Sequence, residues 1–455
     1  MPTCSCNDWS RSRLLRSAAA QAGQGLPAIE AGMPIPAGTG LTRRSFVSRT
    51  AGLALAVYGA AGLGPKALEE GIAAAQAAEP SQRVLVSIYL SGGADSLSIL
   101  APTEDTRYQQ LRPNLRVQPG QGTPFSEDPS LRWHPSAGGL ASLHNQGKLT
   151  VMPAVGYSDA NQSHFTSRHF WEVGDTNPGG RWGWLGRFLD RTGNATNPLQ
   201  GLTIGWDLNP TLAAQNVPVA TVSRPDDYEF VSPDVWNTVS EPMMDTFGEL
   251  GNLATSDPGL AYARGAVAAT GRLRDQLAPF QNGFTLPGDY PAGDFGRRLG
   301  ALAAMLSAGL PLRIVAVEAD GSYDTHSNQA ADLAERLGNA SAALLAFQSD
   351  LERRGLSDRV LVHVWSEFGR RPAENGSGTD HGAAGIGFVM GEHATGQMVG
   401  EFPGLASSQL DEDENLRANV DFRAVYSSLL EQWLAVGADG IIPRASTVGR
   451  VPLVA

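Results

Sequence analysis

Two short, nearly continuous apolar runs rich in β-branched residues stand out along the chain, at residues 83–90 and 359–365. Strands that are apolar at every position are typical of parallel sheets with helices on both faces. Similar runs predict further strands at residues 149–155, 312–319 and 386–390. Residues 329–354 instead carry an apolar position every three or four residues, up to Gly355, which predicts a long helix. This alternation predicts an α/β fold with a doubly wound, mostly parallel sheet flanked by helices.

The middle of the chain, about residues 199–294, breaks this alternation. It is rich in Pro, Asn and Asp and contains an expected helix near residues 260–277. We interpret it as a loop-rich insertion or lid on one domain that spans residues 78–455. The acidic run at residues 411–414 lacks the spaced ligands and turn glycine of a calcium loop, so we expect a solvated loop there.

The N-terminal region predicts an export signal. Arg43 and Arg44 precede a modest apolar run, residues 51–64, and a small-residue stretch that ends at Ala77. This order is typical of signal peptides, and the arginine pair is typical of the bacterial route that exports folded proteins. A membrane anchor is the competing interpretation, but the run is shorter than the roughly 20 apolar residues that a span requires. We therefore expect residues 1–77 to be a twin-arginine signal region cleaved near Ala77. The mature protein would be periplasmic or extracellular, with no stable membrane span.

Composition narrows the function classes. The chain has 455 residues, 34 Lys+Arg against 46 Asp+Glu, and a formal net charge of −12. No basic cluster follows the N-terminal region, which argues against nucleic acid as a partner. The two cysteines, Cys4 and Cys6, lie in the predicted signal region. We therefore expect the mature chain to fold without disulfides, which its length permits.

Polar side chains gather where the predicted strands end. The carboxyl ends of parallel strands meet at one edge of a sheet, and ligands bind there. The carboxylate, hydroxyl and imidazole groups at these ends belong to Asp95, Ser163, Asp324, His326, Glu367, Asp380 and His381. Each alone has a simpler interpretation: Asp95 as a turn former, Ser163 as a helix cap, His326 as a surface residue. Together they predict a site for one or two divalent cations, with Zn, Mn, Mg or Ca as candidates.

The segments that carry these residues resemble a known family. Residues 92–95 (GGAD), 161–165 (NQSHF), 323–329 (YDTHSNQ), 366–371 (SEFGRR) and 378–382 (GTDHG) resemble the twin-arginine-exported family called domain of unknown function 1501. The resemblance covers about Val84 to the C-terminus. That family is similar to the alkaline phosphatase and sulfatase superfamily, which implies an alkaline-phosphatase-like fold.

The resemblance also implies roles for these residues. Ser163 matches the nucleophile that opens a helix, and Asp95 matches the first metal-binding aspartate. One metal site would use Asp324, His326 and His381, with Asp380 beside it. The other would use Asp95, Glu367 and Ser163, because Phe368 stands where the superfamily has a ligand histidine. Such an oxygen-only site would prefer Mg or Ca.

The leading hypothesis is a metal-dependent hydrolase of phosphate or sulfate esters. Ser163 would attack a small-molecule or polymeric ester, and Arg168, Arg370 or Arg371 would bind the ester oxygens. The sulfatase signature, Cys or Ser followed by x-Pro-x-Arg, is missing near Ser163. The alternative is a non-catalytic envelope protein whose degenerate site binds a metal, a glycan or a partner. The sequence identifies no protein partner.

Overall fold

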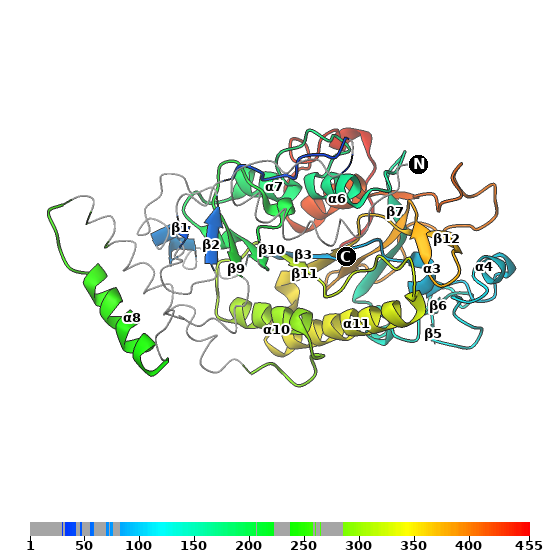
Figure 1. Ribbon diagram of the computed structural model, residues 1–455, viewed down its shortest axis with the longest axis horizontal. Helices are drawn as coiled ribbons and strands as arrows, with labels where there is room; N and C mark the ends of the chain where they lie inside the picture. The colour runs from blue at the N-terminus through cyan, green and yellow to red at the C-terminus, as the bar shows by residue number, and fades with distance from the viewer. Residues whose placement is uncertain are drawn as a thin grey trace.

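The computed structural model places a ten-stranded sheet at the centre of the molecule (Figure 1). The structure describes residues 30, 32–41, 46–47, 55–58, 70–71, 73–75, 82–205, 207–222, 237–257, 260, 264 and 285–455. Arg43, Arg44, Ala77 and most of the predicted helix near residues 260–277 lie outside these residues. Within the part of the chain that is described, none of the helices combines the length and apolar character needed to span a membrane.

Most of the sheet is parallel. In spatial order its strands are β1 (Phe46–Val47), β2 (Leu55–Tyr58), β9 (Val219–Val222), β8 (Gly201–Ile204), β10 (Ile314–Glu318), β3 (Val84–Tyr89), β11 (Val360–Trp365), β14 (Gly385–Met390), β7 (Leu149–Gly156) and β15 (Val420–Asp421). The strands from β9 to β11 are all parallel, and β14 runs antiparallel to both of its neighbours. β1 and β2 are antiparallel additions at one edge.

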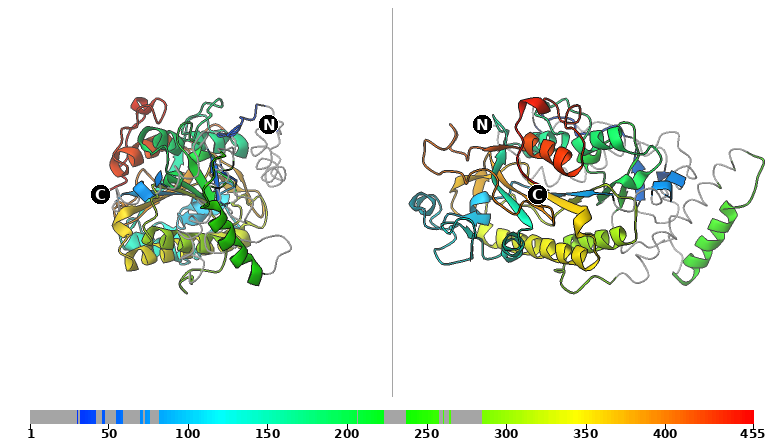
Figure 2. Two further views of the ribbon diagram at one scale, coloured as in Figure 1. Left: turned by 90° about the vertical axis from the view of Figure 1, so that its left-hand side faces the viewer. Right: turned by 180° about the vertical axis from the view of Figure 1, so that it is seen from behind.

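Helices cover both faces of the sheet (Figure 2). One face carries α5 (Gly138–Asn145), α10 (Asp294–Ser307) and α11 (Gln329–Arg353), and the other carries α6 (His164–Val173), α7 (Trp184–Thr192) and α12 (Phe422–Ser428). Side chains of β3 alternate between the two cores: Val84, Val86 and Ile88 join the first, and Leu85 and Tyr89 the second. This double burial explains why the strand is apolar at every position.

The predicted fold class is confirmed, as are all five predicted strands and the long helix α11. Part of the region predicted as a loop-rich insertion, residues 199–294, belongs to the central sheet. Its first part supplies β8 and β9 to the central sheet, parallel to β10. Each of these strands has only four residues, too short to show a periodic pattern among the surrounding prolines. A later part forms α8 (Asn237–Gly251).

β2 comes from the apolar run that the sequence analysis assigns to the signal region. It pairs with β9 over Leu55–Tyr58, and β1 pairs with it in turn. Residues 32–41 lie on the α6 and α7 side of the sheet, where the dark blue trace runs in Figure 1. Parts of the predicted signal region therefore contact the body of the fold.

Candidate metal centre

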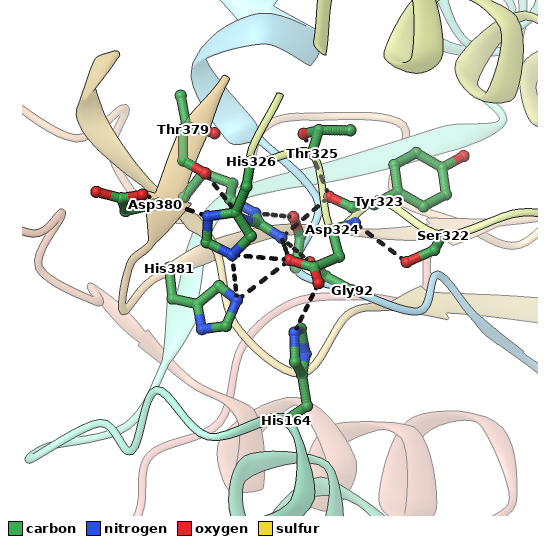
Figure 3. A network of polar contacts seen from close by, with 12 residues as sticks. Gly92, His164, Ser322, Tyr323, Asp324, Thr325, His326, Thr379, Asp380 and His381 are labelled. Atoms are coloured by element: carbon green, nitrogen blue, oxygen red, sulfur yellow. Dashed lines mark hydrogen bonds and ion pairs between the residues drawn. The ribbon is translucent and has the colours of Figure 1, made fainter. Parts of the chain in front are cut away.

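Three histidines surround the carboxylate of Asp324 at the carboxyl-terminal edge of the sheet. Asp324 and His326 lie in the loop between β10 and α11, and His164 is the first residue of α6. His381 ends β13 (Thr379–His381), which pairs with β12 (Arg370–Glu374) in a small hairpin. Loops that follow three elements of the sheet thus deliver the group to one place (Figure 3).

The Nε2 atoms of the three imidazoles converge on Asp324. His326 and His381 lie 3.1 and 3.2 Å from Oδ1, and His164 lies 3.4 Å from Oδ2. The Nε2 atoms of His326 and His381 are themselves 3.0 Å apart. Among the described residues, His164, Asp324 and His381 form a group whose ligand atoms all lie within 4.8 Å of one another.

Each Nδ1 atom has an oxygen acceptor of its own. Nδ1 of His164 lies 2.7 Å from the buried carboxylate of Glu367, and Nδ1 of His381 lies 2.8 Å from the carbonyl of Gln162. A carbonyl oxygen only accepts, so Nδ1 of His381 must donate and its Nε2 keeps the lone pair when the ring is neutral. Nδ1 of His326 lies 3.3 Å from Asp380. Histidines that bind a metal through one ring nitrogen usually donate the N–H of the other nitrogen to an oxygen acceptor.

This donor set fits a divalent cation. Nitrogen lone pairs and a carboxylate that face one another repel unless a proton or a cation lies between them. Three imidazoles and one carboxylate suit Zn or Mn better than the harder ions Mg and Ca. The three imidazoles of His164, His326 and His381 are therefore the part of the donor set that favours Zn or Mn over Mg and Ca.

Without a cation, protons lie between the imidazole nitrogens and the carboxylate of Asp324. Burial lowers the pKa of His164, but its contacts with Asp324 and Glu367 outweigh burial and raise that pKa to about 9. Burial is the main reason that the pKa of His381 falls to about 4. Burial would raise the pKa of Asp324, yet hydrogen bonds from the three histidines and the charge of Arg370 hold it far below its usual range. At neutral pH the group therefore holds an ionised Asp324, a charged His164 and a neutral His381.

Arg370 is a buried side chain that forms an ion pair with Asp324 and so holds its carboxylate in position. Its guanidinium is fully buried, and Nη2 lies 2.6 Å from Oδ1 of Asp324. Nη2 also donates to the carbonyls of Gly92 and Tyr323, while Nε donates to Gly93 and Nη1 to Thr379. Arg370 is thus engaged by Asp324 and backbone carbonyls, which favours a positioning role for it over the predicted contact with ester oxygens.

Glu367 holds His164 in the same manner. Its buried carboxylate accepts hydrogen bonds from the amides of Gly92 and Gly93 as well as from His164. Gly92 has a φ of 112°, and an added Cβ would lie 2.4 Å from the amide of Asp324. Only glycine can bring the backbone this close. Glu367, which the sequence predicts as a direct ligand, thus contacts Nδ1 of His164, whereas Nε2 of that ring faces Asp324.

Asp95 lies apart from the histidines. Its carboxylate accepts two hydrogen bonds from Arg112, at 2.6 and 2.9 Å, and others from Ser98, Gln329 and the amide of Leu97. Burial would raise the pKa of Asp95, but Arg112 and these hydrogen bonds lower it overall. The structure therefore pairs the predicted ligand with a buried arginine and does not assemble the predicted oxygen-only site from Asp95, Glu367 and Ser163.

Ser163 directly precedes His164, at the N-cap of α6. Its side chain makes no capping hydrogen bond. Oγ instead donates to Oε2 of Glu30 at 2.5 Å. The hydroxyl thus contacts Glu30 instead of the first-turn amides of α6.

Arg168 and Asp380 each contact other side chains of the protein. Nε of Arg168 lies 2.6 Å from Glu172, and its guanidinium lies over the ring of Tyr89. Asp380 is exposed and contacts His326 and Asn375. Both side chains are engaged by residues of the chain itself, Arg168 by a carboxylate and Asp380 by an imidazole.

His164 is the member of the group that the sequence analysis did not single out. It lies in the NQSHF segment next to Ser163, so its position after a strand was visible. For a histidine at the first position of a helix, no neighbouring sequence feature shows whether it binds a metal or is simply a buried core residue. The signal that identifies it is spatial, because its partners lie 160 or more residues away in the chain.

The family comparison agrees with part of this picture. Residues 269–433 match the model of a family described as a protein of unknown function (DUF1501). The resemblance seen in the sequence is thereby confirmed for this stretch. It contains Asp324, His326 and His381 but not His164. No curated protein sequence matches the chain.

Solved structures that resemble the chain include a sulfatase and an alkaline phosphatase. The PsFucS1 sulfatase from Pseudoalteromonas sp. is 11% identical over 80% of this chain and 70% of its own, with a TM-score of 0.32. Ps i-CgsB in complex with k-i-k-neocarrahexaose is 8% identical over 81% and 75%, with a TM-score of 0.34. The TAB5 alkaline phosphatase, a mutant with Mg bound, is 12% identical over 70% and 94%, with a TM-score of 0.29. Likenesses this low do not extend to function, so the proposal below depends on the site itself.

Proposed function

We propose that the protein is an exported, metal-dependent hydrolase of phosphate or sulfate esters. The observation that supports this most is the convergence of three imidazole Nε2 atoms on Asp324, each ring anchored at Nδ1 by an oxygen acceptor. His164, His381 and Asp324 would hold the cation. His326, whose side chain is 36% exposed, would be the ligand on the open side.

A divalent cation at such a site supplies positive charge that lowers the pKa of a nearby hydroxyl and stabilises developing negative charge. The chain's own residues set the geometry around it. Glu367 and the Gln162 carbonyl fix the rings of His164 and His381, and Arg370 fixes Asp324. We assign Arg370 and Glu367 as positioning residues, not as groups that contact the ester.

Ser163 is the proposed nucleophile. It is adjacent in sequence to His164, and its hydroxyl does not cap α6. The amide groups at the start of that ten-residue helix would favour an anionic ester group beside the serine. Attack by Oγ would form an ester with the phosphorus or sulfur atom and release the alcohol, and water would then release the acid.

The test of this function is hydrolysis of a generic aryl phosphate and aryl sulfate by the cation-loaded protein. Ser163→Ala should keep the cation and lose hydrolysis by at least about 1000-fold, as expected when a nucleophile is removed. Ser130→Ala, which changes an exposed hydroxyl in a loop, is the control. Equal hydrolysis by Ser163→Ala and wild type would exclude the serine as nucleophile.

A non-catalytic, metal-binding envelope protein is the second candidate. The observation that favours it is that Asp95 is paired with Arg112, so the described residues do not form the predicted second cation site. A wild-type protein that binds a cation but hydrolyses neither ester would support this candidate over the enzyme.

Export through the twin-arginine route rests on Arg43 and Arg44, which lie outside the described residues. Replacing both with Lys should leave the precursor in the cytoplasm. Fractionation of cells that express each form measures this. Unchanged export of the Lys-Lys variant would contradict the proposed route.

A further inference from the structure

A short piece of the predicted signal region lies against the proposed nucleophile. We call it the N-terminal strap: residue 30 together with residues 32–41. Oε2 of Glu30 accepts the hydrogen bond from Oγ of Ser163 at 2.5 Å. The other carboxylate oxygen, Oε1, is buried and has no hydrogen-bond partner. A carboxylate of the chain thus lies at the hydroxyl that the proposed reaction requires.

Two further hydrogen bonds to the backbone of the strap hold it against the body of the protein. The amide of Gly38 donates to the carbonyl of Arg181 at 3.0 Å, and Nη2 of Arg181 donates to the carbonyl of Thr39 at 3.0 Å. Both contacts lie in the loop between α6 and α7. They hold the strap against the segment that follows α6, whereas Glu30 contacts Ser163 at the start of the same helix.

Apolar packing supports the same arrangement. Ala37 is 6% exposed and packs with Val173 and Ala213, whereas Ile35, two residues earlier, is 49% exposed. Gly38 has a φ of 78°, and a Cβ added there would lie 3.0 Å from the Cβ of Ala213. The strap therefore has one side fitted to the body of the protein and one side in solvent.

We propose that the N-terminal strap is an intramolecular cover of Ser163. All of its residues precede Ala77, so cleavage of the predicted signal region would remove it and uncover the serine. The proposal rests on the proposed function in taking Ser163 as the reacting group. Its consequence is that the precursor is held inactive until the strap leaves, while the metal ligands remain in place.

The test measures the accessibility of residue 163 without any need for hydrolysis. In the full chain, Cys4 and Cys6 are replaced by Ser and Ser163→Cys supplies the only thiol. The alkylation rate with iodoacetamide is then compared between two further substitutions, Ala37→Asp and Ile35→Asp. The same residue is introduced at a buried and at an exposed position of the strap, so Ile35→Asp is the matched control.

Ala37→Asp should raise the alkylation rate about tenfold over Ile35→Asp, because a carboxylate is disfavoured in the apolar contact and the strap detaches. Glu30→Ala, which leaves the packing of Ala37 intact, should also raise the rate. Circular dichroism and cation content verify that each variant is folded. Equal rates in Ala37→Asp, Glu30→Ala and Ile35→Asp would overturn the proposal.

A second set of measurements separates this inference from the function on which it rests. With Ser163 restored, Ala37→Asp and Glu30→Ala should increase aryl ester hydrolysis. If alkylation is faster but no variant hydrolyses an ester, the cover stands and the proposed function fails. If esters are hydrolysed but alkylation and hydrolysis are unaffected by the strap variants, the function stands and the cover fails.

Discussion

The Nε2 atoms of His326 and His381 lie 3.0 Å apart and face the same carboxylate oxygen of Asp324. Nδ1 of His381 donates its proton to the Gln162 carbonyl. A neutral His381 ring therefore has no proton on Nε2 to place between the two nitrogens. Without a cation, a proton on Nε2 of His326 can fill this contact, and a bound cation would take its place as the partner of both nitrogens and of Asp324. This pair of atoms is therefore the most direct structural reason to expect metal binding.

The first prediction concerns loss of a ligand. His381→Gln should lower Zn affinity by at least about 100-fold, more than the roughly 10–100-fold that follows when only the hydrogen-bond partner of a ligand is lost. A chelator should lower the thermal midpoint of the wild type, because the cation binds only the folded state. Metal analysis and calorimetry measure both effects. His393→Gln, outside the group, is the control, and equal Zn content in both variants would contradict the site.

The second prediction concerns pH. Because the pKa of His164 is about 9 in the cation-free site, its ring carries a proton below pH 9 that a cation must displace. Cation affinity should therefore rise about tenfold per pH unit between pH 6 and 9, with about one proton released at pH 7. Calorimetry in two buffers of different ionisation enthalpy counts that proton. An affinity that stays constant over this range would show that His164 is not a ligand.

The third prediction assigns Glu367 a positioning role. Glu367→Gln removes the charge that helps to hold Nδ1 of His164, so cation affinity should fall about 10–100-fold. The pKa of His164, followed by NMR in the cation-free protein, should fall as well, a change that a general loss of stability would not produce. Glu412→Gln, in the exposed acidic loop, is the control. An unchanged pKa of His164 would remove the assigned role.

Much of the fold was predictable because burial on both faces leaves a strong signature. β3 and β11 read as continuous apolar runs, and α11 begins at Gln329 as predicted and ends within one residue of the predicted position. The convergence of Asp324, His326 and His381 also followed from loops at the carboxyl ends of strands. β8 and β9 were not predicted, because four residues show no period and their place in the sheet depends on β10.

The part of the site that sequence reasoning missed depends on distant partners. Asp95 follows a strand as a metal ligand would, but Arg112, which occupies both its oxygens, has no local mark that assigns it to this carboxylate. His164 likewise gains its meaning from Glu367, 203 residues later in the chain. A residue's position after a strand predicts which edge of the sheet it reaches. Which side chain it contacts at that edge can be seen only in the structure.

The fourth prediction separates Asp95 from the metal centre. Arg112→Met leaves a buried carboxylate without its charged partner and should lower the free energy of unfolding by about 3–5 kcal/mol. Asp95→Asn leaves the buried guanidinium of Arg112 without its charged partner, so it should also destabilise the protein, but it should retain the cation. Urea unfolding and metal analysis measure the two quantities. Loss of the cation from folded Asp95→Asn would return Asp95 to the ligand set.

The fifth prediction concerns acid stability. His363 is buried in β11, and burial lowers its pKa to about 3, against about 6.5 in an unfolded chain. The unfolded state therefore binds a proton between pH 6.5 and 3 that the folded state does not, so stability falls as pH falls through this window. The contribution is about 1.4 kcal/mol per pH unit. His363→Leu should flatten that part of the stability profile, and a parallel profile would contradict it.

The order of strands has a consequence for how the chain can be divided. β10 and β11 lie within the stretch that matches the family model, but β3, which pairs with both of them, lies far outside it. β14 likewise depends on β7 for its second neighbour. A polypeptide trimmed to residues 269–433 would have gaps in the middle of its sheet and would lack His164. The stretch that matches the family model is therefore only part of an interleaved sheet, and Asp324, His326 and His381 acquire their geometry only when β3 and β7, from earlier in the chain, lie between its strands.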